Sequence, residues 1–167
     1  MIGLRNFIYV YGGISGSGQG QQAHFPELAQ ITVEQYTIAS DVWSTIAIST
    51  APKLAAFSWC QMGDTAQLAI VGGTNGDIQS DEMYIMDLQA GTVQSSSFEF
   101  NTSMGLMSYN QRTNTLYHIG GMNSDGVDYK VTLDDAERRW TEIDHNHSLV
   151  LNANCLELCN APSVYFY

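Results

Sequence analysis

The chain has 167 residues, of which 44% are hydrophobic and only 14% are charged, a composition that provides a core and excludes a disordered chain. Its formal net charge is −11, because only six lysines and arginines stand against 17 aspartates and glutamates. Phosphate backbones need clustered cations, so we expect no nucleic-acid partner, and no apolar run is long enough for membrane insertion as a helix.

The first apolar run, residues 7–11, is rich in aromatic and β-branched side chains and predicts a buried strand that ends at Gly12 and Gly13. The polar residues 14–30 that follow are expected to form a long loop with a glycine- and serine-rich tip at 15–20. These glycines precede no helix start and lack the lysine of a P-loop, so we interpret the tip as a solvated loop rather than a phosphate site.

The rest of the chain alternates between short runs with high strand propensity and turns marked by glycine, asparagine, aspartate or proline. Strands are predicted at residues 33–38, 42–48, 54–61, 67–71, 83–88, 92–100, 106–109, 115–119, 129–133 and 140–143. Because helical periodicity is almost absent, the predicted fold class is all-β. The strands group into units at 4–50, 54–100 and 104–145, with a degenerate fourth unit at 147–167, and we expect them to form a single domain over residues 1–167.

Glycine pairs end one strand in each of the first three units. They are Gly12-Gly13, Gly72-Gly73 and Gly120-Gly121, placed 60 and 48 residues apart. A residue without a β-carbon permits positive φ and close backbone approach, which we expect at these strand ends. Repeated four-stranded units of this length are typical of propeller blades, which cover both faces of each sheet by stacking around an axis.

The apolar strand, the glycine pair and a later Tyr and Trp resemble the kelch repeat. Tyr36 and Trp43 show the family's seven-residue interval, and only the first unit has both aromatic residues. The corresponding positions in the second and third units are assigned to Met86 with Val93 and to Leu133 with Trp140. The resemblance implies a kelch-type β-propeller segment of the galactose oxidase-like superfamily, built from four-stranded antiparallel blades.

The same resemblance implies an incomplete ring, since kelch propellers close with about five to seven blades and the units make roughly three and a half. The chain is expected to begin at the second strand of its first unit, with no inner strand before residue 7. Open blade edges invite pairing with further strands. We therefore expect the ring to be completed by further blades of its own chain, by a partner protein or by a homo-oligomer.

Function is expected to reside in the loops on one face of the propeller. The binding-loop candidates are Ser15, Ser17, Gln19, Gln21, Gln22, Asn75, Asp77, Asn123 and Asp125. We expect a non-enzymatic scaffold that binds another protein through this face. The alternatives are a secreted carbohydrate-binding or carbohydrate-modifying propeller, and a structural subunit of a larger assembly that docks by its open blade edges.

Residues with metal or redox chemistry are too scattered to predict a site. His145 and His147 share one strand face, but no third ligand stands at a suitable spacing. Cys60, Tyr109 and His118 have the residue types of the copper radical oxidases found among kelch-type propellers, yet they show no diagnostic spacing. We therefore expect no catalytic residue, no metal and no cofactor.

The cysteines and the N-terminus bear on the compartment. Cys60, Cys155 and Cys159 are an odd number, which predicts free, buried thiols rather than a disulfide framework. The first residues lack the charged, apolar and small-residue pattern of a secretory signal. A cytoplasmic location is expected, with a secreted one as the alternative.

Overall fold

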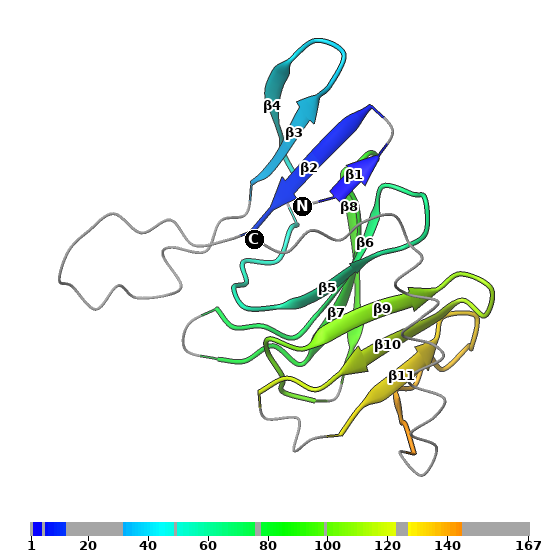
Figure 1. Ribbon diagram of the computed structural model, residues 1–167. Coiled ribbons are helices and arrows are strands. Elements are labelled where there is room, and N and C mark those ends of the chain that lie inside the picture. Colours follow the sequence, from blue (N-terminus) through cyan, green and yellow to red (C-terminus); the bar gives the residue numbers. More distant parts are fainter. Residues whose placement is uncertain are drawn as a thin grey trace, which may run out of the picture.

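The computed structural model describes residues 2–4, 6–12, 32–48, 50–75, 78–98, 100–122 and 127–144 (Figure 1). Their regular structure consists of the strands β1 Ile2–Leu4, β2 Phe7–Tyr11, β3 Val33–Thr37, β4 Val42–Ile46, β5 Ser58–Gln61, β6 Gln67–Val71, β7 Glu82–Asp87, β8 Thr92–Ser97, β9 Leu106–Asn110, β10 Thr115–Ile119, β11 Tyr129–Thr132 and β12 Thr141–Glu142. The described residues contain no helix long and apolar enough to cross a membrane.

The strands form three four-stranded sheets, each with its strands in chain order. The first sheet comprises β1–β4, the second β5–β8 and the third β9–β12, and every pairing is antiparallel. The prediction of an all-β chain with four-stranded antiparallel units is thereby confirmed. The predicted boundaries at 67–71 and 115–119 agree with β6 and β10, whereas the run at 54–61 is a strand only over Ser58–Gln61.

The expectation that the chain begins at the second strand of its first unit is wrong. β1 pairs with β2, with Ile2 opposite Tyr9 and Leu4 opposite Phe7. Three residues were too few to show a strand pattern in the sequence, but they suffice to form a ladder beside a strand already fixed on its other edge. The first sheet is therefore a complete four-stranded unit.

The three sheets lie one after another in the same order as in the sequence (Figure 1). One core cluster joins the first sheet to the second through Tyr9, Val33, Ile48, Leu68, Ile70, Met86 and Leu88. A second cluster joins the opposite face of the second sheet to the third through Cys60, Ala69, Val71, Met83, Phe98, Met107, Leu116, Val131 and Trp140. Because successive side chains along a strand point to opposite faces, the second sheet is covered on both of its faces.

The sheets repeat one another residue by residue. The centre of each contains an equivalent pair on the second and third strands: Ile8 opposite Tyr36, Leu68 opposite Met86, and Leu116 opposite Val131. An equivalent amide also follows each third strand, where the N–H groups of Ile38, Leu88 and Leu133 donate to the carbonyls of Asn6, Ala66 and Asn114 at 3.0, 3.0 and 2.8 Å. Ile38, Leu88 and Leu133 are thus equivalent positions.

This alignment corrects the third aromatic interval predicted from the sequence. Tyr36 lies opposite Trp43. In the third sheet Lys130 lies opposite Thr141, and the same register places Trp140 opposite Val131 rather than opposite Leu133. The connection at 133–140 is longer than its counterparts at 38–41 and 88–91, so a fixed spacing of seven residues does not hold there.

The glycine pairs have the predicted backbone conformation. The φ angles are +76° at Gly12, +64° and +88° at Gly72 and Gly73, and +62° and +107° at Gly120 and Gly121. Gly13 lies outside the described residues. At Gly72 a β-carbon would lie 2.2 Å from the carbonyl oxygen of Thr102, in the segment that leads into the third sheet, so this glycine also sets the approach of neighbouring units.

Candidate functional site

The segments after the glycine pairs are tied to the segments that enter the sheets. Thr74 and Ala55 exchange backbone hydrogen bonds of 2.8 and 2.9 Å, and Met122 and Ser103 form the equivalent pair at 2.7 and 3.4 Å. The amide of Met104 donates to the carbonyl of Ala56 at 2.8 Å and so links the two units. These bonds join the ends of the second and third sheets into one continuous rim.

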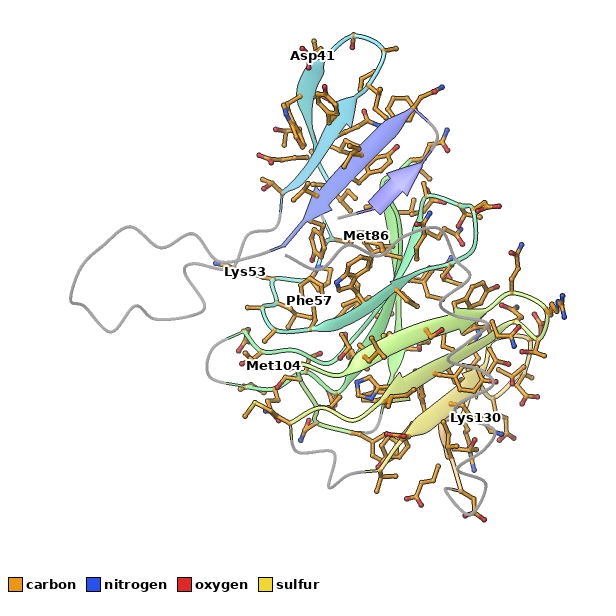
Figure 2. The ribbon with its side chains drawn as sticks, viewed as in Figure 1. Asp41, Lys53, Phe57, Met86, Met104 and Lys130 are labelled. Atoms are coloured by element: carbon orange, nitrogen blue, oxygen red, sulfur yellow. The ribbon has the colours of Figure 1, made fainter. Side chains whose placement is uncertain are left out.

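Large apolar side chains on this rim point into solvent. Their exposed fractions are 68% for Ile78, 66% for Met104, 54% for Leu106 and 56% for Met122. We call these four residues the glycine-end surface. Figure 2 places Met104 on the same side of the molecule as Phe57 and Lys53, where the chain passes into the second sheet. Apolar side chains gathered on one rim are a typical feature of interaction surfaces.

An open groove of about 460 Å³ continues this surface beside Ile78. It is lined by Pro52, Lys53, Leu54, Asn75, Ile78, Gln79, Ser80, Asp81, Glu82 and Tyr84. The lining combines apolar side chains with two carboxylates, one ammonium group and several uncharged polar groups. Such a lining can hold an extended segment with both apolar and polar side chains.

Hydrogen bonds and ring packing hold both walls of the groove. On one side, the hydroxyl of Tyr11 donates to the carbonyl of Pro52, and the Tyr11 ring packs on Phe57 with 5.6 Å between centroids. On the other side, the amide of Ser80 donates to the carbonyl of Gly73 at 2.9 Å. Burial, with a hydrogen bond to Glu82, raises the pKa of Tyr84 to about 12.

Of the predicted binding-loop residues, Asn75 alone lies within the described part of the chain, and it lines the groove. Its side-chain oxygen Oδ1 accepts a hydrogen bond of 3.0 Å from the backbone N–H of Ile78, and its backbone N–H donates to the carbonyl of Ile78 at 3.2 Å. Asn75 therefore shapes the turn that presents Ile78. The other candidates lie outside the described residues: Ser15, Ser17, Gln19, Gln21, Gln22, Asp77, Asn123 and Asp125.

Sequence reasoning missed the apolar members of the glycine-end surface. Met122 follows directly after a glycine pair, and Ile78 lies in the turn after another. A large apolar residue just past the end of a strand was the available signal. The binding residues predicted from the sequence are polar loop residues instead.

The candidates for redox or nucleophilic chemistry are enclosed between the second and third sheets. Nε2 of His118 lies 3.1 Å from Oγ of Ser58, and both side chains are buried. Cys60 is a free, buried thiol, as predicted, and burial raises its pKa to about 12, so it is not a thiolate at pH 7. The Tyr109 hydroxyl donates to Oδ1 of Asn114 at 2.8 Å. None of these groups faces the groove.

The described residues contain no group of three or more His, Cys, Asp or Glu side chains placed to hold a metal ion. His145 and His147, the pair considered from the sequence, lie outside the described residues, as do Cys155 and Cys159.

A scan against protein-family models finds no family that matches the chain, and a search of the curated proteins finds no significantly similar relative. The functional proposal consequently depends on the geometry of the sheets and of the glycine-end surface.

Proposed function

We propose that this chain is part of a kelch-type β-propeller and serves as a non-enzymatic scaffold that binds another protein through the glycine-end surface. The observation that supports the proposal most strongly is the exposure of Ile78, Met104, Leu106 and Met122 on one rim. Exposing four large apolar side chains costs solubility, and a partner that covers them removes this cost. The stacking of equivalent four-stranded sheets supports the propeller part of the proposal.

The chemistry of the surface describes the partner. Methionine side chains are flexible and polarizable, so Met104 and Met122 can adapt to apolar side chains of different shapes. Asp81 and Glu82 line the adjoining groove, and the whole chain carries a net charge of −11. Opposite charge favours association and its rate. The partner is therefore an extended protein segment that carries apolar residues next to lysine or arginine.

Peptide selection tests this function. A phage-displayed library of random linear peptides, panned on the folded chain, should yield peptides that combine apolar and basic residues. Substitution of Met104→Lys together with Met122→Lys should weaken the selected peptides by at least about tenfold in Kd, equivalent to ~1.4 kcal/mol, when binding is measured by calorimetry.

The matched control for that experiment is Gln89→Lys together with Ala90→Lys, which adds the same two positive charges on the exposed turn that joins β7 to β8. It should leave the Kd unchanged, which separates local contact from the general effect of added positive charge. Failure to select any peptide, or equal affinities for the double variant and the control, would refute binding at this surface.

A further inference from the structure

The face of the first sheet that points away from the second sheet is uncovered in the described part of the chain. It carries Ile8, Val10, Glu34, Tyr36 and Trp43 on β2–β4, and Ile38 just beyond β3. We call it the outer face. Ile38 is 51% and Trp43 54% exposed, and the rings of Tyr36 and Trp43 pack together with 5.1 Å between centroids.

The equivalent positions in the other two sheets are buried. Leu88 and Leu133, the counterparts of Ile38, are both buried, as are Met86 and Val131, the counterparts of Tyr36. Trp140, which occupies the position of Trp43 in the third sheet, is only 6% exposed. In each case the preceding sheet covers the position. The outer face is thus equivalent to these stacking faces, but no described residue covers it.

The structure also shows which face of a sheet covers the stacking face of the next sheet. The first sheet covers the second with the side chains that alternate with the outer face, among them Tyr9 and Val33. The corresponding face of the third sheet carries Tyr117, Ile119 and Lys130, and no strand of the described residues stacks on it (Figure 1). We call it the far face. Figure 2 shows Lys130 and the β3–β4 turn residue Asp41 at opposite ends of the stack.

We propose that the outer face of the first sheet stacks on the far face of the third sheet of a second copy of this chain. The contact joins copies head to tail, so it is heterologous, and it repeats within the assembly the stacking already seen twice within one chain. It uses neither the groove nor the glycine-end surface. The two proposals can therefore fail independently.

Charge complementarity supports a second copy as the occupant. Ile85 of the second sheet and Tyr129 of the third pack in the same core region. Their counterparts at the proposed contact are Lys130 on the far face and Glu34 on the outer face, as the registers of the third strands show. Both side chains are exposed in the single chain. Head-to-tail stacking brings these opposite charges together in a chain that has only six cations.

The test is a charge exchange read out by light scattering and sedimentation. The unmodified chain should form a discrete species whose mass is a multiple of 18.4 kDa and which dissociates on dilution. Glu34→Lys and Lys130→Glu, each alone, should weaken association about tenfold or more. The double variant should restore it, because residue 34 of one copy meets residue 130 of the next at every contact.

Asp64→Lys reverses an exposed charge in the turn between β5 and β6 and should leave association unchanged. Circular dichroism spectra of all variants show whether each is folded. A single species of 18.4 kDa at every concentration would overturn the proposal, leaving an intramolecular cover or a different protein as the occupant. An oligomer that neither single reversal weakens, or that the double variant fails to restore, would overturn it as well.

Discussion

The two glycines that open the second and third pairs share a conformation but not an environment. The φ angles of Gly72 and Gly120 are +64° and +62°, so adding a β-carbon raises the conformational free energy of the backbone by about the same amount at both positions. At Gly120 the new atom meets nothing within 4 Å among the described residues, whereas at Gly72 it meets the carbonyl oxygen of Thr102 at 2.2 Å. Comparing substitutions at these two glycines therefore distinguishes backbone strain within one residue from a steric clash between two units.

We predict that Gly120→Ala lowers the free energy of unfolding by about 1–2 kcal/mol, and that Gly72→Ala lowers it by at least about 1 kcal/mol more. The extra loss arises because the backbone around Thr102 must move away from the new methyl group. Urea titration of both variants beside the unmodified chain measures the difference. Equal losses would show that the approach of Thr102 to Gly72 is not a tight contact in solution.

His118 makes the stability of the second and third sheets sensitive to acid. Burial lowers its pKa to about 4, while the nearby Asp128 carboxyl acts in the opposite direction and is outweighed. The unfolded chain protonates this histidine near its usual pKa of about 6.5. Between these values the unfolded state binds more protons, so stability is complete above about pH 6.5 and falls as pH drops toward 4.

The predicted loss attributable to His118 is roughly 3 kcal/mol at pH 4 relative to pH 7. Other carboxylates also titrate in this range, so the measurement is the difference between the unmodified chain and His118→Gln, which has no imidazole to protonate. Unfolding midpoints at a series of pH values give the two slopes. The substituted chain should show the shallower one, and parallel slopes would exclude His118 as the acid-sensitive group.

At the scale of elements, the sequence predicted what repeats and missed what departs from the repeat. β6 and β10 were predicted at their true boundaries, because an apolar run followed by two glycines marks both the strand and its end. β1 was missed because three residues carry no readable periodicity. The partner of Trp140 was misassigned because the connection before β12 is longer than its counterparts.

The candidate site was less predictable than the fold. Asn75, which the sequence predicts as a binding-loop residue, lines the groove, and its role in binding stays a prediction. The position of Met104 depends on a hydrogen bond that crosses from one unit to the next, from its backbone amide to the carbonyl of Ala56. Contacts of that kind leave no pattern within a single strand or turn, so the sequence predicts that apolar residues at these positions are buried.

Among the three sheets that the structure describes, the central one has the most completely covered faces. It is covered on both faces, whereas the first and third sheets are each covered by a neighbouring sheet on one face in the described part of the chain. In stacked repeats, stability is close to the sum of the stability of each unit and of its interfaces with its neighbours. Local opening should therefore begin at the ends of the stack.

The third strands β3, β7 and β11 test this point at the positions where each pairs with a strand on both sides, which for β11 are Tyr129 and Lys130. In hydrogen exchange at low protein concentration, amides of β7 should be the slowest, with β3 and β11 exchanging faster. Raising the concentration should slow β3 and β11 and leave β7 unchanged, because head-to-tail stacking covers the outer and far faces alone. Equal protection of all three strands in the dilute chain would contradict the idea that stability is the sum of unit and interface terms. Exchange rates of β3 and β11 that do not change with concentration would contradict self-association alone.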